Sequence, residues 1–157
     1  MTLGRPRVTI LEADPAGTEA RACLSSYYAE LARRLPGGFD VTLSRDPEAA
    51  AMRRPRGVFL LAAGTSGPVG CVGLRGHGEW AEVKRLWISA DARGAGVASR
   101  LMARIETVAR DLGMVLLRLD TNAALTEAAA LYRKTGWTEI PRFNDDPYAQ
   151  IFFEKRL

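Results

Sequence analysis

The segment that most constrains the fold joins a strand pattern to a helix pattern through glycines: Arg93-Gly94-Ala95-Gly96-Val97-Ala98. Upstream, the residues from Trp80 to Ser89 read as one long strand. Downstream, apolar residues recur at i, i+3, i+4 and i+7 as far as Leu112, which predicts an amphipathic helix. Val115–Leu119 is then a short apolar run typical of a buried strand. The chain must therefore accommodate a strand–helix–strand unit in which a tight turn opens the helix.

This turn has the chemistry of an anion-binding site. The first N–H groups of a helix have no intrahelical partner, and the helix dipole places roughly half a positive charge at that end. Glycines leave no side chains in the path of a phosphate, and Arg93 supplies a positive charge that can pair with phosphate oxygens. The segment lacks the Lys-Ser/Thr ending of a P-loop and the third glycine of a dinucleotide fingerprint, which disfavours both folds. The alternative is a tight turn without a ligand.

The remaining patterns predict the other elements of a single α+β domain covering residues 1–157, with no internal repeat or linker. Strands are predicted at Val8–Leu11, Val58–Ala63, Val69–Leu74, Trp137–Ile140 and Gln150–Glu154. Helices are predicted at Thr18–Leu35, at Asp46–Met52 and between Asn122, as its N-cap, and Gly136. Glycine-rich turns join the middle strands, so they are expected to form an antiparallel meander.

Composition narrows the classes of function. The net charge is +4, which a phosphorylated cofactor would satisfy, and no basic helix carries interleaved aromatics, so no nucleic-acid partner is expected. No apolar run approaches the roughly 18 residues of a membrane helix, and the stretch Met1–Arg7 lacks the apolar core of a signal peptide. Cys23 and Cys71 match no metal or redox spacing. We therefore expect a cytoplasmic protein with reduced thiols, no metal site and no membrane contact.

Together these segments resemble the GNAT acetyltransferases. Arg93, Gly96 and Ala98 meet the family's Arg/Gln-x-x-Gly-x-Gly/Ala signature, and residues 81–88 resemble its fourth strand. The sequence Ala-x-x-Leu-Tyr-x-x-x-Gly-Trp at residues 128–137 is similar to the family's signature in the last helix. The resemblance covers the chain strongly from about Gly57 to the end. It implies the GNAT acyl-CoA N-acyltransferase fold, a central mixed sheet of six to seven strands flanked by about four helices.

The resemblance also implies acetyl-CoA as the cofactor, with CoA as the product. In this family the fourth strand opens away from the fifth, and the pantetheine arm of the cofactor inserts between them like an extra strand. The residues that this carries over as cofactor-binding are Leu86, Trp87 and Ile88 through their backbone, and Arg93, Gly94, Ala95, Gly96, Val97 and Ala98. Many relatives have an asparagine where this chain has Leu125, and Asn122 is the candidate replacement.

Acetyl transfer to an amine needs a proton acceptor for the amine, donors for the charge that develops on the thioester oxygen, and a proton for the departing thiolate. By resemblance, Glu82 is the candidate base; the alternative is a solvated strand charge paired with Lys84 or Arg85. Tyr132 is the candidate acid; the alternative is an aromatic residue that only packs in the core. The single histidine, His77, lies between glycines and is interpreted as a turn residue without a role.

The acceptor is expected to be a primary amine of a small molecule. Tyr28, beside Tyr27 and Glu30, and the acids Asp145 and Asp146 are candidates for binding it; the alternative is that these acids are turn residues, since Asn-Asp-Asp-Pro favours a turn. Two other functions share the cofactor signatures: acetylation of protein N-termini or lysines, and non-catalytic sensing of acyl-CoA. Relatives are often dimers, so a homodimer is expected by resemblance alone.

Overall fold

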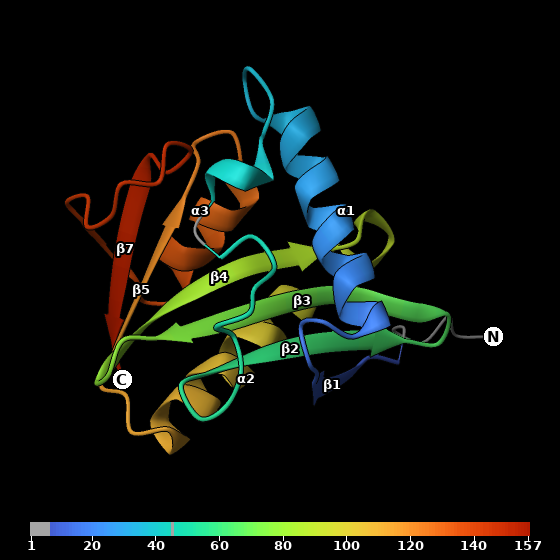
Figure 1. The fold of residues 1–157 in the computed structure, drawn as a ribbon, viewed down its shortest axis with the longest axis horizontal. Helices are drawn as coiled ribbons and strands as arrows, with labels where there is room; N and C mark the ends of the chain where they lie inside the picture. The colour runs from blue at the N-terminus through green and yellow to red at the C-terminus, as the bar shows by residue number, and fades with distance from the viewer. Residues whose placement is uncertain (1–6, 45) are drawn as a thin grey trace.

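The computed structural model describes residues 7–44 and 46–157, which form one seven-stranded sheet with helices on both faces (Figure 1). Residues 1–6, most of the stretch considered above for a signal peptide, lie outside the described residues. The strands are β1 (Thr9–Glu12), β2 (Gly57–Gly64), β3 (Gly67–Gly76), β4 (Trp80–Ile88), β5 (Leu116–Thr121), β6 (Thr138–Ile140) and β7 (Ile151–Arg156). The helices are α1 (Thr18–Arg34), α2 (Val97–Asp111) and α3 (Thr126–Lys134), with short 3₁₀ turns at Val41–Leu43 and Ala90–Ala92.

The strand order across the sheet is β1-β2-β3-β4-β5-β7-β6. β1 to β4 form an antiparallel meander, and β5, β7 and β6 form a second antiparallel group. Among the residues that the structure describes, the two groups meet at β4 and β5, which run parallel and are connected through α2. The sequence predicted this strand–helix–strand unit because the hydrophobic period changes at the glycine-containing turn.

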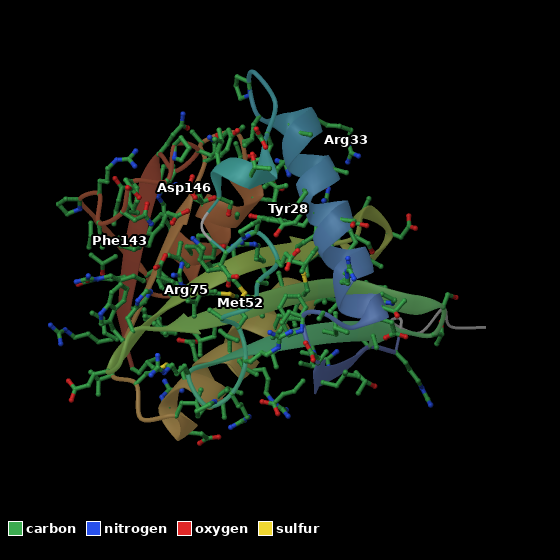
Figure 2. All side chains as sticks on the ribbon, viewed as in Figure 1. Tyr28, Arg33, Met52, Arg75, Phe143 and Asp146 are labelled. Carbon is green, nitrogen blue, oxygen red and sulfur yellow. The ribbon has the colours of Figure 1, made fainter. Side chains whose placement is uncertain are left out.

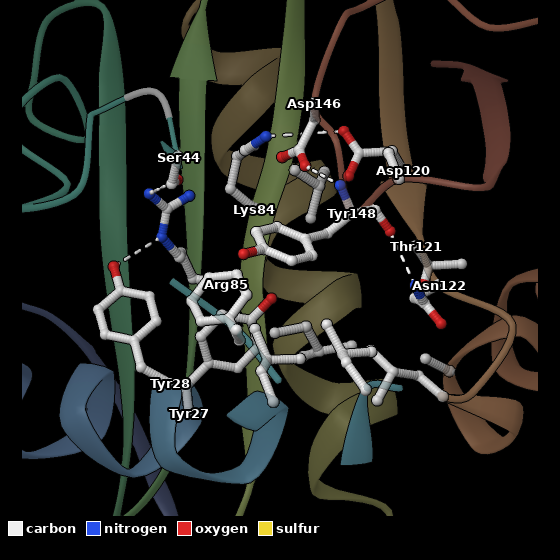
Figure 3. Close-up of a pocket in the computed structure, with 18 of the residues that line it drawn as sticks. Tyr27, Tyr28, Ser44, Lys84, Arg85, Asp120, Thr121, Asn122, Asp146 and Tyr148 are labelled. Atoms are coloured by element: carbon white, nitrogen blue, oxygen red, sulfur yellow. Dashed lines mark hydrogen bonds and ion pairs between the residues drawn. The ribbon is translucent and has the colours of Figure 1, made fainter. Parts of the chain in front are cut away.

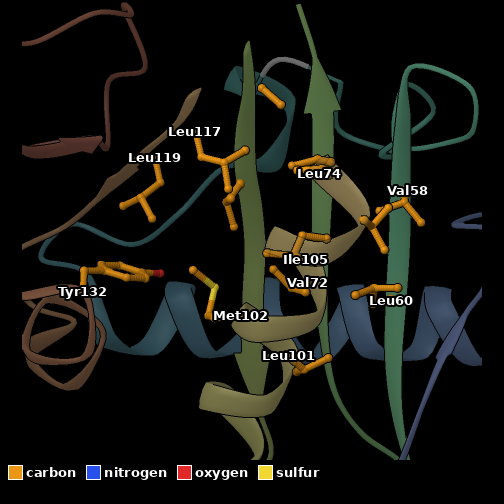
Figure 4. Close-up of a cluster of buried hydrophobic side chains, with 14 of the residues drawn as sticks. Val58, Leu60, Val72, Leu74, Leu101, Met102, Ile105, Leu117, Leu119 and Tyr132 are labelled. Atoms are coloured by element: carbon orange, nitrogen blue, oxygen red, sulfur yellow. The ribbon is translucent and has the colours of Figure 1, made fainter. Parts of the chain in front are cut away.

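Each face of the sheet has its own hydrophobic core. On one face, α2 packs with inward residues of β2 to β5 and with Tyr132 of α3; Leu101 and Ile105 are fully buried there (Figure 4). On the other face, α1 packs through Cys23 and Leu24 against β2 and β3. Alternate residues of one strand therefore serve opposite cores, as Leu60 and Leu61 of β2 do. Burial on both faces explains the continuous apolar runs that predicted these strands.

The predicted strands are confirmed, and their ends differ by no more than a few residues. The helix predicted at Asp46–Met52 is wrong. Asp46 and Ala49 have φ of 55° and 57°, the left-handed region, and the Asp46 carboxylate accepts hydrogen bonds from the N–H groups of Ala50 and Ala51 at 2.7 and 2.8 Å. An aspartate that binds the backbone of the following residues competes with helix formation, so this segment forms turns instead.

The N-cap predicted for the last helix is also wrong. α3 begins at Thr126 after the N-cap residue Leu125. Asn122 instead bridges two segments: its side-chain oxygen accepts from the Ala124 N–H at 2.9 Å, and its amide donates to the Tyr148 carbonyl at 2.9 Å. Within the described part of the chain, no helix is both long and apolar enough to cross a membrane.

Candidate active site

The pairing between β4 and β5 ends partway along both strands. Residues 80–82 of β4 pair with residues 116–118 of β5. Beyond Glu82, β4 continues to Ile88 beside β3, and no further pair joins it to β5 among the described residues. This edge of β4 therefore offers main-chain donors and acceptors to an extended ligand, as an open sheet edge does for a peptide. The opening of the fourth strand away from the fifth, implied by the resemblance, is present.

A β-bulge in β4 lies beside this opening. Residues 71 and 73 of β3 lie opposite residues 87 and 84 of β4, so Arg85 and Leu86 together face a single residue of β3. Arg85 has a φ of 62°, in the left-handed region. The extra residue resets the alternation of the strand: Leu86 packs into the α2-face core, while Arg85 contacts α1 on the other face. The bulge thus directs a buried cation toward the opening.

Arg85 ties three segments together there. It is only 6% exposed, and its Nε donates to the Tyr28 hydroxyl at 3.0 Å. Its Nη2 donates to the Asp46 carbonyl at 2.8 Å and to the Ser44 hydroxyl at 3.3 Å. Tyr28 in turn donates to the carbonyl of Pro47 at 2.8 Å. These bonds hold α1 and the chain after it over the carboxyl end of β4.

A pocket, here called the central pocket, lies where β4 and β5 part (Figure 3). Tyr27 and Tyr28 of α1 contribute to one wall, Lys84 and Arg85 of β4 to another, and the ends of β5 and α3 and the loop before β7 complete it. Aromatic rings are frequent in it, since Phe39 and Tyr148 lie with their centroids 4.7 Å apart on the same rim. The central pocket is therefore apolar at its walls, with a few charged groups directed inward.

Tyr132 contributes a phenol hydroxyl to the central pocket. It is 5% exposed, lines the central pocket, and directs its hydroxyl from α3 toward β4 (Figure 4). Its ring packs against Trp137 and Phe153, with centroids 6.0 and 5.7 Å away. Burial, with the nearby Tyr27 and Asp120, raises the pKa of Tyr132 above its usual range, so the phenol keeps its proton at neutral pH. Tyr132 therefore packs in the core, as the alternative interpretation expects, and it also reaches the pocket, where its role as acid stays a prediction.

Asp120 and Lys84 meet across the opening. Their side chains are 14% and 13% exposed, and Lys84 Nζ lies 3.6 Å from Asp120 Oδ2. The amide of Asn144 donates to the same oxygen at 2.7 Å. Burial raises the pKa of Asp120, and the charge of Lys84 and the bond from Asn144 oppose that rise. The central pocket thus contains a carboxylate that binds a proton more tightly than a solvated one does.

Glu82 lies outside the central pocket. It lines a second pocket, here called the outer pocket, with Arg75, Lys84 and residues 144–147, and the two pockets share Lys84 and Asp146. Glu82 is 7% exposed; its Oε1 lies 2.8 Å from His77 Nε2, and its Oε2 lies 3.4 Å from Lys84 Nζ. The alternative of pairing with Lys84 is thus observed. His77, interpreted as a turn residue without a role, contacts Glu82 and stacks on Trp80 with ring centroids 4.2 Å apart.

The glycine-containing loop and the start of α2 have open backbone. Gly94 and Gly96 have φ of 82° and 78°, and a Cβ built on either would have no described atom within 4 Å. Gly96 is the N-cap, no side chain of the described residues caps α2, and its first turn contains no acidic residue. The first N–H groups of the helix, which have no intrahelical partner, can donate hydrogen bonds to an anion. Arg93 already pairs with Glu30 and donates to the Ile88 carbonyl at 3.2 Å.

The residues predicted to bind the acceptor are divided between the two pockets. Tyr28 and Asp146 both line the central pocket, one on α1 and one in the loop before β7 (Figures 2 and 3). Asp145 is exposed and lines only the outer pocket. The turn alternative is also observed, since the carboxylate of Asp146 accepts from the Tyr148 N–H at 2.8 Å and its own N–H donates to Asn144 at 3.1 Å.

Sequence reasoning missed Asp120 and Arg85 as residues of the pocket, whereas Tyr27, considered with Tyr28 for the acceptor site, does line it. A polar residue directly after the apolar run Val115–Leu119 was the available signal for Asp120, because strand ends commonly carry functional groups. Nothing in the sequence indicated the bulge that turns Arg85 inward. The part of the chain that the structure describes contains no group of three or more His, Cys, Asp or Glu residues arranged to hold a metal ion.

Comparison with known proteins agrees with this geometry. The model of the acetyltransferase (GNAT) family matches residues 24–137. An IAA acetyltransferase from Azospirillum brasilense is 31% identical over 157 residues, covering 97% of this chain and 99% of the relative. A blasticidin-S acetyltransferase from Streptomyces morookaense is 34% identical over 124 residues, covering 72% of this chain and 89% of the relative.

Among solved structures, the PaiA N-acetyltransferase from Thermoplasma acidophilum, in complex with coenzyme A, superposes with a TM-score of 0.69. The match covers 96% of this chain and 99% of that one at 16% identity, and at such identity it shows the fold alone. The family model spans most of the chain and the first relative spans nearly all of it, which confirms the resemblance drawn from the motifs. The chain therefore belongs to the GNAT family of acetyltransferases.

Proposed function

We propose that this protein transfers the acetyl group of acetyl-CoA directly to a primary amine of a small molecule. The observation that carries the proposal is the juxtaposition of an opened β4–β5 pair, with an edge free for an extended arm, and a central pocket that contains a buried phenol and a largely buried carboxylate. The family membership supplies the reaction class. The two curated relatives are named for acetylation of IAA and of blasticidin-S, and neither name refers to a protein.

The geometry of the loop and of β4 supports a donor site for acetyl-CoA. Acetyl-CoA supplies an activated acetyl thioester on a long arm that ends in a diphosphate. The main chain of Leu86, Trp87 and Ile88 lies along the open edge, where it can pair with that arm, and one N–H there can polarise the acetyl carbonyl. The backbone of residues 93–98 and the opening turn of α2 provide donors for the diphosphate. Asn122, which lines the central pocket, is a further candidate contact.

Tyr132 is the proposed acid. The departing thiolate, whose conjugate thiol has a pKa of about 8.5, needs a proton from a group held close to it. A buried phenol that remains protonated at neutral pH meets that need if its hydroxyl reaches the sulfur. The direction of the hydroxyl toward β4 supports this role. The role of Glu82 as base stays a prediction, and Glu82 lines the outer pocket rather than the central pocket that contains Tyr132.

The experiment combines calorimetric titration with CoA and a CoA-release assay over a panel of amines: spermidine, 2-phenylethylamine, free amino acids, an aminoglycoside and a lysine-containing peptide. We expect CoA to bind and at least one small amine to release CoA from acetyl-CoA. Release with the peptide alone would favour the protein acetyltransferase, and binding without release to any amine would favour the sensor. A protein that does not bind CoA would contradict both the donor site and the proposed reaction.

A further inference from the structure

We propose that Asp120 is the residue that accepts the proton of the acceptor amine; this rests on the proposed acetyl transfer and assigns the base within that same site. The carboxyl end of β5 brings Asp120 into the central pocket that also contains Tyr132. The acceptor ammonium must lose a proton before its nitrogen can attack, and the group that takes the proton must lie in the same space as the reacting carbonyl. Asp120, at the carboxyl end of β5, is a carboxylate that lies in this space.

The register of the two strands explains the placement. Glu82 and Arg118 are partners in the last β4–β5 pair, and the next residues on the same face are Lys84 and Asp120. Charges of opposite sign therefore alternate across this face of the sheet. Because pairing ends at the first of these rungs, Glu82 sits where the strands are closed and Asp120 sits where they have parted. The opening thus exposes Asp120, and not Glu82, to the central pocket.

The contacts of the two carboxylates also favour Asp120 over Glu82 as the proton acceptor. Glu82 is bound through Oε1 by His77 and approached at Oε2 by Lys84. Within the described part of the chain, Lys84 and Asn144 contact Asp120 at Oδ2, and the side chain lines the pocket. Oδ1 is therefore the atom that can receive a proton from a ligand in the pocket.

The charged and titratable groups around Asp120 come from every element that packs there. β4 contributes Glu82, Lys84 and Arg85, α1 contributes Tyr27 and Tyr28, α3 contributes Tyr132, and the loop before β7 contributes Asp146 and Tyr148. Burial raises the pKa of Asp120, which makes it a stronger base than a solvated carboxylate once ionised. The negative charge of Asp120 also contributes to the raised pKa of Tyr132. When Asp120 has taken a proton, that contribution ends and the phenol becomes a better donor.

The proposed transfer balances in protons and electrons. Asp120 Oδ1 takes one proton from the ammonium, and the neutral nitrogen uses its lone pair to form the bond to the acetyl carbon. The carbon–sulfur bond breaks with its electron pair remaining on sulfur, and the Tyr132 hydroxyl gives that sulfur a proton. The second proton lost by the nitrogen restores the phenol. Asp120 returns its proton to water through the outer pocket, which adjoins the central pocket at Lys84 and Asp146.

The test compares Asp120→Asn with Glu82→Gln and with Glu154→Gln, an acid-to-amide control on β7 at the closed end of the strand pair. Two acceptors of equal length are used: 2-phenylethylamine, which is protonated at pH 7, and O-benzylhydroxylamine, which is mostly neutral there. We expect Asp120→Asn to lower kcat/KM for the first acceptor by on the order of 10²-fold and to lose the acid limb of the pH–rate profile. The loss with the second acceptor should be at least tenfold smaller, because that nitrogen needs no base before attack.

Glu82→Gln should keep the acid limb, and Glu154→Gln should leave the profile unchanged. If the acid limb of the pH–rate profile is lost in Glu82→Gln and kept in Asp120→Asn, the assignment is overturned. If Asp120→Asn lowers kcat/KM equally for both acceptors, Asp120 has a structural role, and the assignment is overturned as well. A readout that needs no turnover is the ¹³C titration of the Asp120 carboxyl with CoA bound: a pKa at or below the ordinary aspartate value also overturns it. Absence of CoA binding in the wild type would instead contradict the proposed function.

Discussion

The two ends of the β4–β5 pair are built from the same two strands and behave differently. At the closed end, residues 80–82 and 116–118 are joined by backbone pairing, and Arg118 covers the rings of Trp80 and Phe143 at 5.0 and 5.6 Å and approaches Glu154 at 3.4 Å. At the open end, no described backbone pair remains, and charged side chains converge on the central pocket. Charges at the closed end are thus used for packing, and charges at the open end face a cavity.

This difference shows which part of the sheet can bind a ligand. A parallel pair that stays closed satisfies its own main chain and leaves nothing for a ligand. A pair that separates leaves polar main chain and side chains without sheet partners, and a ligand can then complete them. Glu82 stands at the boundary, in the last closed rung, which is why strand pattern and resemblance alone could not assign its role.

The largest expected effect belongs to the open end. Tyr132→Phe should lower kcat by about 10²-fold or more, because the thiolate would leave without a proton donor, while the affinity for CoA stays within about twofold. Steady-state kinetics with calorimetry of CoA binding measures both. Tyr27→Phe is the matched control, since it removes a hydroxyl from the opposite wall of the same pocket and should cost much less turnover. Equal kcat in wild type and Tyr132→Phe would reduce Tyr132 to a packing residue.

A smaller effect is expected at the start of α2. Ser99 is exposed in the first turn, where an acid stabilises a helix by about 0.3–1 kcal/mol through the dipole and the free N–H groups. Ser99→Asp should therefore raise the melting temperature and, by repelling the diphosphate, weaken CoA binding by roughly tenfold. Ser99→Asn tests the change in size without the charge. If Ser99→Asp stabilises the protein and binds CoA as tightly as wild type, the diphosphate lies elsewhere.

The smallest effect is expected at the closed end. Arg118→Ala removes a cation from two aromatic rings and should lower the free energy of unfolding by about 1 kcal/mol, with kcat/KM within about twofold of wild type. Urea denaturation monitored by fluorescence measures the first quantity. Arg118→Met keeps much of the apolar contact and should recover part of the stability. A large loss of turnover in a stable Arg118→Ala protein would break the distinction between the two ends.

Much of the fold could be predicted because its signals are local. The change of hydrophobic period around Arg93–Ala98 fixed the strand–helix–strand unit, and continuous apolar runs marked strands buried on both faces. The two wrong predictions also have local causes, because in each a side chain binds nearby backbone groups. At Asp46 the carboxylate accepts from the following backbone, so turns replace the predicted helix. At Asn122 the side-chain oxygen accepts from the Ala124 N–H and the amide donates to the Tyr148 carbonyl, so the side chain does not cap α3.

The glycine-containing turn that opens α2 and the position of Tyr132 in its signature could be predicted, because both depend on residues close together in the chain. Which charged side chains meet depends instead on contacts between distant segments. Asp120 reaches the central pocket, and Glu82 the outer one, because β4 and β5 separate after the pair of Glu82 and Arg118. The bulge in β4 changes the face on which Arg85 lies. Register and strand separation depend on packing between distant segments, and no local pattern encodes them.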